Sequence, residues 1–274
     1  MRKVLFFFTV LCLAGLLLLA ADVEPAAGPS VQATEPPPVT EPVLQTQPVT
    51  EETDPVQTQA TEPAEQATEP AREELPFFPV EQLDRYNFEL QQYVPGQTQI
   101  GTDRICLTAV MEEDACLSGK AESRAAFRYG TFSFRIRTTR KDGFFPAIWM
   151  LPTSGERYPE VDIYEAIGNE PNLVYGVIHR SEYDVDKDFF TKWIGDDRID
   201  GSYVLTFVWT EDAMTWYMDG EEIAVIDDVP QIPMYMICNL AVGGGWAGQP
   251  DPADFPEQFE VEILEFAPEE VFSR

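Results

Sequence analysis

The chain has 274 residues, of which 48 are acidic and 18 are basic, and its formal net charge at pH 7 is −30. Residues 1–75 contain 12 of the acids and three of the bases, so residues 76–274 carry 36 acids and 15 bases, a formal net charge of −21. A field of this sign repels phosphate backbones and sulfated polymers. The composition therefore argues against nucleic acid as a partner and favours a neutral ligand.

The N-terminal segment starts with Met1-Arg2-Lys3 and continues as an almost uninterrupted apolar run from Val4 to Ala21. A basic start followed by such a run predicts either a secretory signal peptide or an uncleaved N-terminal anchor over residues 1–21. Both alternatives predict an exported protein that is secreted or held at the cell surface.

Residues 22–75 are dominated by Pro, Thr, Glu, Gln and Ala, and the triplet Thr-Glu-Pro recurs at 34–36, 40–42, 61–63 and 68–70. This composition lacks the apolar residues that a core requires, and its prolines favour extended conformations. We therefore predict a disordered, semi-rigid linker, which would hold the following domain away from a membrane or cell wall.

Residues 76–274 suffice for one sizeable core, and we expect a single monomeric domain. Short alternating apolar and polar runs predict ten strands, at 104–110, 130–137, 145–151, 161–166, 173–179, 203–209, 214–218, 222–226, 235–242 and 259–266. Asp219-Gly220 predicts a tight hairpin, because both residues tolerate positive φ angles. Many strands at this spacing predict an all-β sandwich of two antiparallel sheets, with Trp209 and Trp216 in the core.

Several other kinds of site have little support in the sequence. His179 is the sole histidine, and neither a G-x-S-x-G motif nor a phosphate-binding glycine loop is present. The acids of 184–188 resemble the start of a calcium loop, but Phe189 occupies the position that needs glycine. We expect a solvated loop over 180–202.

Three cysteines lie outside the N-terminal segment. Cys106 and Cys116 flank a predicted hairpin, so a disulfide between them is conceivable in an exported protein, with Cys238 buried and free.

An acidic strand is the most informative feature of the domain. In Glu-Val-Asp-Ile-Tyr-Glu, residues 160–165, Glu160 and Asp162 share one strand face while Glu165 would point the other way. The three carboxylates converge only if one extra residue is bulged out between Asp162 and Glu165. Such a cluster is costly, because like charges raise the pKa of at least one member.

Cleavage of a glycosidic bond gives this cluster a purpose. A retaining glycosidase needs one ionised carboxylate as nucleophile and one protonated carboxyl as acid, about 5–5.5 Å apart. Glu160 and Glu165 would supply this pair, and Asp162 would hydrogen-bond to the nucleophile and help hold the proton on the acid. The alternative is a solvent-exposed acidic strand in an acidic protein.

Seven sequence blocks in register resemble glycoside hydrolase family 16, and the resemblance covers roughly residues 84–266. The blocks are 118–119, 129–135, 145–151, 159–165, 177–179, 216–220 and 239–244. The resemblance implies a jelly-roll β-sandwich with a concave substrate cleft. It also implies Glu160 as nucleophile, Glu165 as acid/base and Asp162 as the assisting carboxylate.

The E-x-D-x-x-E spacing is similar to the laminarinase-like branch, which implies β-1,3-glucan as substrate and no required cofactor. The resemblance further implies a set of substrate-binding residues: Arg135, Trp149, Tyr158, His179, Asn239 and Trp246. It allows a structural calcium ion near Glu262. Two alternatives remain open, a non-catalytic carbohydrate-binding sandwich and a transglycosylase, and the latter would use the same residues.

Overall fold

The computed structural model describes residues 75–113, 115–138, 140–181, 187–193 and 202–274. The predicted signal or anchor segment, 1–21, lies outside these ranges, as do residues 22–74 of the predicted linker and 184–186 of the acidic run. Within the described ranges, no helix has the length and apolar character needed to cross a membrane.

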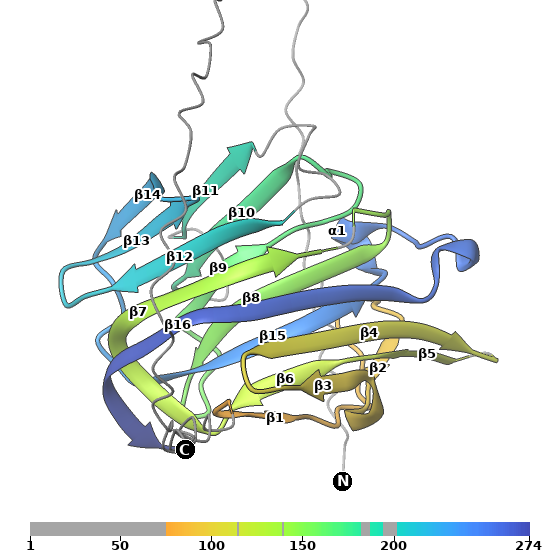
Figure 1. The fold of residues 1–274 in the computed structure, drawn as a ribbon, viewed down its shortest axis with the longest axis horizontal. Helices are drawn as coiled ribbons and strands as arrows, with labels where there is room; N and C mark the ends of the chain where they lie inside the picture. The colour runs from red at the N-terminus through yellow and green to blue at the C-terminus, as the bar shows by residue number, and fades with distance from the viewer. Residues whose placement is uncertain (1–74, 114, 139, 182–186, 194–201) are drawn as a thin grey trace, which may run out of the picture. The chain divides into compact units, whose positions relative to one another are not determined.

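Two antiparallel sheets form the described domain (Figure 1). We call the first sheet I; its strands, in spatial order, are β11 (Asp188–Trp193), β10 (Leu173–His179), β9 (Glu160–Glu165), β8 (Phe144–Pro152), β15 (Met234–Val242), β6 (Lys120–Ser123) and β1 (Phe77–Pro79). Sheet II has the order β14 (Glu221–Asp227), β13 (Ala213–Met218), β12 (Tyr203–Trp209), β7 (Ala125–Arg137), β16 (Glu257–Ser273), β4 (Arg104–Glu112) and β3 (Thr98–Ile100).

Shorter elements complete the fold at its edges. Strand β5 (Ala115–Ser118) forms a hairpin with β4, and β2 (Gln91–Tyr93) adds to β5 in parallel. The helix α1 (Gly244–Ala247) follows β15, and 3-10 turns cover Pro95–Gln97 and Pro252–Asp254. A single pair, Met234 and Phe127, connects the sheets through β15 and β7.

The core lies between the two sheets, where the inward-facing residues of most long strands are buried. The rings of Tyr164 on β9 and Phe259 on β16 stack with centroids 5.9 Å apart. The indole N–H of Trp216 on β13 donates to the carbonyl of Ile163 on β9 at 3.0 Å. Trp209 and Trp216 are fully buried, as predicted, and the expected two-sheet all-β fold is confirmed.

The predicted hairpin at Asp219-Gly220 connects β13 and β14, with φ angles of 51° and 83° at the two turn positions. Both values fall in the left-handed region that this turn requires, and Asp219 also accepts a 2.9 Å hydrogen bond from the backbone N–H of Val204.

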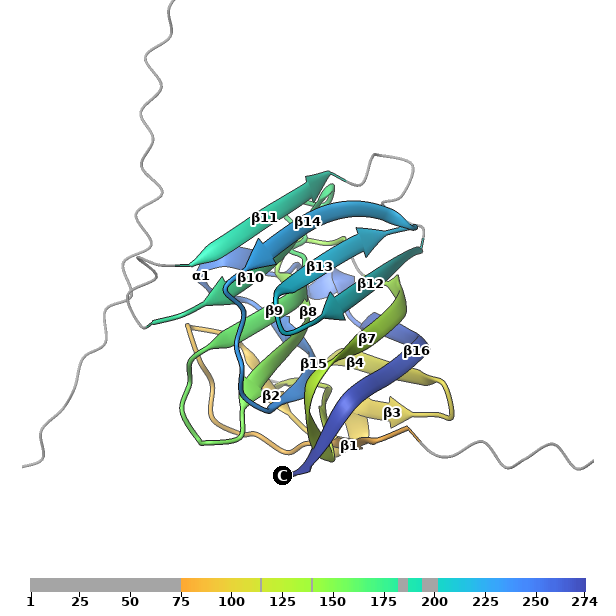
Figure 2. The same cartoon turned by 90° about the vertical axis from the view of Figure 1, so that its left-hand side faces the viewer.

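One expectation was wrong. The segment 180–202 is not a simple loop, because residues 188–193 form β11, the edge strand of sheet I, which lies next to β14 (Figure 2). The sequence left a disulfide between Cys106 and Cys116 open, and in the structure both thiols are free, as is that of the buried Cys238. Cys116 lies opposite Met111, and Cys106 is five residues further along β4 with the opposite alternation, so the two side chains face different sides of the strand.

Candidate active site

The acidic strand β9 contains the bulge that the sequence requires. Asp162 pairs with Trp149 of β8 and Val177 of β10, whereas Glu165 pairs with Ala147 and Tyr175. Three steps along β9 thus match two steps on each neighbour, which leaves one extra residue in β9. Ile163 and Tyr164 both turn into the core, and Glu165 returns to the outer face of sheet I, where Glu160 and Asp162 lie.

An imidazole and a guanidinium lie beside Glu160. The Nε2 atom of His179 lies 3.1 Å from Asp162 Oδ2 and 4.0 Å from Glu160 Oε1, and Arg157 Nε lies 4.0 Å from Glu160 Oε2. His179 faces the acids because it pairs directly with Glu160 across β9 and β10. These contacts stabilise negative charge on Glu160, as a carboxylate nucleophile requires.

Glu165 has the opposite environment. Burial raises the pKa of its carboxyl well above the ordinary value, the charges of Asp162 and Glu160 raise it further, and Lys187 opposes this shift. The carboxyl therefore retains its proton at a pH where an ordinary glutamate is ionised. Two carboxyl groups on one face with opposed environments can act as nucleophile and acid of one reaction.

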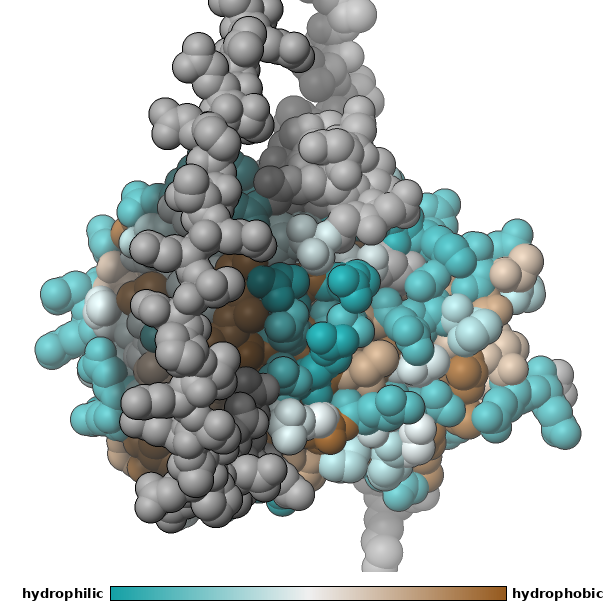
Figure 3. All heavy atoms as spheres, in the orientation of Figure 1, coloured by the Kyte–Doolittle hydropathy of each residue, from teal (hydrophilic) through white to brown (hydrophobic). Residues whose placement is uncertain are grey.

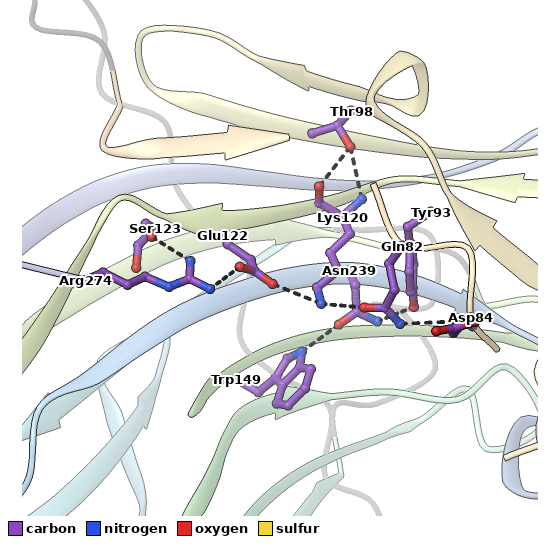
Figure 4. Close-up of polar contacts among 10 residues, drawn as sticks. All are labelled: Gln82, Asp84, Tyr93, Thr98, Lys120, Glu122, Ser123, Trp149, Asn239 and Arg274. Carbon is purple, nitrogen blue, oxygen red and sulfur yellow. Dashed lines mark hydrogen bonds and ion pairs between the residues drawn. The ribbon is translucent and has the colours of Figure 1, made fainter. Parts of the chain in front are cut away.

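Trp149 is fixed beside the acids by a short chain of side-chain hydrogen bonds (Figure 4). Its indole N–H donates to Asn239 Oδ1 at 2.6 Å, and Asn239 Nδ2 donates to the hydroxyl of Tyr93 at 3.1 Å. Asn239 and Tyr93 are buried, and burial raises the pKa of the Tyr93 hydroxyl, so this hydroxyl stays neutral. Trp149 itself is partly exposed on the same face as Asp162.

Trp246 lies over the Glu165 end of the site. Its ring contacts Phe145 and Tyr175 edge-on, each with centroids 5.1 Å apart, and it remains 43% exposed. Because Tyr175 pairs directly with Glu165, this aromatic group borders the acid. Tyr158 stands two residues before Glu160, partly exposed, with the Arg157 guanidinium 5.5 Å from its ring centre.

Comparison with known proteins places this arrangement in a family. The model described as Glycosyl hydrolases family 16 matches residues 87–263, more than half of the chain. The chain belongs to this family.

Two relatives of this family 16 member have names that contain glucanase or glycanase. It is 32% identical over 167 residues to the Beta-glucanase of Rhodothermus marinus, a match that covers 52% of this chain and 58% of the relative. It is 35% identical over 130 residues to the Endo-1,3-1,4-beta-glycanase EglC of Rhizobium meliloti (strain 1021), a match that covers 47% of this chain and 28% of the relative. The chain thus spans less than two thirds of either relative.

The fold agrees with solved structures. The laminarinase from Rhodothermus marinus superposes with a TM-score of 0.60 at 26% identity, covering 69% of this chain and 89% of that one. The endo-beta-1,3-glucanase from Pyrococcus furiosus superposes with a TM-score of 0.56 at 26% identity, covering 68% of this chain and 81% of that one. The jelly-roll β-sandwich expected from the resemblance is confirmed.

Arg135 does not join the other predicted residues of this family 16 domain. Phe134 and Ile136, its neighbours on β7, fill the core, so Arg135 faces outward from sheet II, on the opposite side of the sandwich from the acids. There its guanidinium pairs with Glu262 of β16 at 2.6 Å, in a region where hydrophilic side chains gather over the middle of β16 (Figure 3). Its expected role in binding substrate is not compatible with this position.

The same ion pair bears on the calcium site expected near Glu262. A guanidinium 2.6 Å from the carboxylate repels a second cation and already satisfies the charge of Glu262. A structural calcium ion near Glu262 stays a prediction. Among the described residues, one group has the spacing of metal ligands, namely Glu160, Asp162 and His179, whose ligand atoms lie within 4.8 Å of one another.

Sequence reasoning missed three residues of the site. Phe145 and Tyr175 could have been found by alternation. Tyr175 lies four residues before His179 on one predicted strand, so the two residues share a face. Phe145 lies four residues before Trp149 in the same way. Arg157 precedes β9 outside any strand, and no local pattern indicates it.

Proposed function

We propose that this chain is a retaining endo-glycosidase that hydrolyses β-1,3 bonds of a neutral glucan. The observation that carries the proposal is the opposed environment of two carboxyl groups on one sheet face. Glu160 has His179 and Arg157 beside it, whereas Glu165 is held protonated by burial and by neighbouring negative charge.

The reaction proceeds in two displacements. Glu160 attacks the anomeric carbon and forms a glycosyl ester while Glu165 donates its proton to the departing glycosidic oxygen. Glu165, now ionised, takes a proton from water as the water attacks the same carbon and releases Glu160. Asp162, held by His179 at 3.1 Å, keeps negative charge near Glu165 and so helps it recover its proton.

Aromatic rings suit a neutral sugar. Trp149, beside Asp162, and Trp246, near Glu165, offer flat, partly exposed apolar faces, and Tyr158 stands two residues before Glu160. Asn239 contributes by holding Trp149. The net charge of −21 on residues 76–274 disfavours a polyanionic substrate and nucleic acid.

The names of relatives support the substrate class. They include Glucan endo-1,3-beta-glucosidase A1 of Niallia circulans, at 28% identity over 183 residues. A Keratan-sulfate endo-1,4-beta-galactosidase of Sphingobacterium multivorum is also similar, at 26% identity over 161 residues, and its name indicates a different, sulfated substrate. We further propose that the enzyme is exported and acts as a monomer, secreted or tethered at the cell surface through its N-terminal segment and linker.

Digestion of a polysaccharide panel tests the proposal. The full chain is incubated with laminarin, mixed-linkage glucan, agarose and carrageenan, and new reducing ends are measured. We expect release of oligosaccharides of several lengths from laminarin, and a loss of at least about a thousandfold in Glu160→Gln. Equal activity of Glu160→Gln and the parent would refute the nucleophile, and cleavage of carrageenan alone would refute the neutral substrate.

A further inference from the structure

The register of sheet I aligns four residues in one row across neighbouring strands. Trp149 of β8 pairs with Asp162 of β9, Asp162 pairs with Val177 of β10, and Val177 pairs with Phe189 of β11. Directly paired residues of adjacent strands project to the same face. Phe189 therefore lies on the same face as Asp162, two strands away, and on the side opposite Trp149. At about 4.8 Å per strand this separation is roughly 10 Å.

The outward position of Phe189 is enforced by its neighbour. Phe190 packs inward against Trp216, with ring centroids 5.1 Å apart, and occupies the space over Gly176 of β10. A Cβ at Gly176 would lie 2.3 Å from the Phe190 ring, so the absence of a side chain there is required for this packing. Since Phe190 is held in the core, Phe189 must face out, and it is 64% exposed.

The start of β11 is fixed next to the site. Arg180, directly after His179, donates to Asp188 Oδ2 from Nη2 at 2.6 Å and from Nε at 3.2 Å. Its third nitrogen, Nη1, donates to the carbonyl of Asp228 at 2.6 Å. Asp188 pairs with Ile178, the residue before His179, which places the beginning of this strand near the site.

We propose that Phe189 is a sugar-binding platform on the side of the catalytic acids opposite Trp149. Single exposed apolar residues on a protein surface are common, but this ring lies in the row that contains Asp162 and Trp149. A phenyl ring offers the same flat apolar face to a sugar as an indole does. A glucan lying along the row would contact one aromatic ring on each side of the bond that is cut. This inference rests on the proposed function and extends it to a further subsite.

The test measures kcat/KM of the full chain on β-1,3-gluco-oligosaccharides of increasing length. Phe189→Ala is expected to lower kcat/KM about tenfold on long chains and to leave the shortest cleaved oligosaccharide within about twofold, because the shortest substrate does not reach Phe189. Phe189→Trp should restore the long-chain value. Val271→Ala, at an apolar residue of β16 that is 63% exposed on sheet II, is the matched control and should equal the parent.

The outcomes separate the two proposals. If the parent cleaves the oligosaccharides and Phe189→Ala matches it at every length, the platform is refuted while the glucanase function stands. An equal loss at all lengths, or in Val271→Ala, refutes it as well. If the parent does not cleave these oligosaccharides and the Glu160→Gln variant does not bind them, both proposals fail. Phe189→Gln, which keeps a long side chain without a ring, replaces the alanine variant should that variant not fold.

Discussion

Asn239 gives the sharpest test of how the site is built, because its side chain forms hydrogen bonds with two other side chains of the protein. Asn239→Ala removes the acceptor of the Trp149 indole N–H and the donor to Tyr93. Two hydrogen bonds at about 1 kcal/mol each give a loss of about 2 kcal/mol in the free energy of unfolding. For a domain of this size, 1 kcal/mol lowers Tm by about 2–4 °C, so we expect a fall of about 4–8 °C.

Substrate binding should weaken for a separate reason. Without Asn239 the Trp149 ring is no longer fixed, and ordering it on binding costs about 0.5–1.5 kcal/mol, which raises KM by about two- to tenfold with little change in kcat. The decisive assay is a double-mutant cycle on laminarin in which Asn239→Ala is introduced into the parent and into Trp149→Ala. Tyr93→Phe, which removes one hydroxyl, serves as the milder control.

If Asn239 acts through Trp149, its substitution changes KM by less than about twofold in the Trp149→Ala background. A further tenfold loss in that background would show that Asn239 binds sugar directly, and the reasoning from its hydrogen bonds would be wrong.

Three further predictions concern charge and packing. Because the pKa of Glu165 is raised, ionisation of its carboxyl destabilises the folded state. Glu165→Gln should therefore unfold at a higher temperature than the parent at neutral pH, and the difference should vanish below about pH 4.5. Equal melting temperatures at pH 7 would contradict this. Asp162→Asn removes a neighbouring charge, lowers the pKa of Glu165 and should move the alkaline limb of the kcat/KM profile to lower pH; a shift upward would contradict the assignment. Arg135→Ala should keep KM and kcat within about twofold and change the free energy of unfolding by less than about 1 kcal/mol in chemical denaturation, because its ion pair is a partly exposed surface pair; a large rise in KM would return Arg135 to the site.

The bulge in the acidic strand could be predicted because its pattern has few solutions. Glu160, Asp162 and Glu165 can share a face only with an extra residue between the last two, and the register of β9 contains that residue. The hairpin at Asp219-Gly220 followed in the same way from the φ angles that these residues tolerate. Both features depend on local chemistry that the sequence displays directly.

The features that sequence missed depend on which side of a sheet a residue occupies. Alternation on β7 places Arg135 with Ser133, but it does not say whether that face lies over the acids or away from them. Strand β11 was missed because its outward residues are mixed in character and charged residues precede it. Its strand pairing is fixed by a distant contact, Phe190 against Trp216, which no local window contains.

The stereochemistry of the first product tests the central claim most directly. The full chain is mixed with laminarin in an NMR tube, and the anomeric proton of the new reducing end is followed before mutarotation. If Glu160 attacks the anomeric carbon while Glu165 protonates the leaving oxygen, the β-anomer appears first and the α-anomer grows in later. Initial release of the α-anomer would mean a single displacement by water, and the roles given to these two carboxyl groups would be wrong.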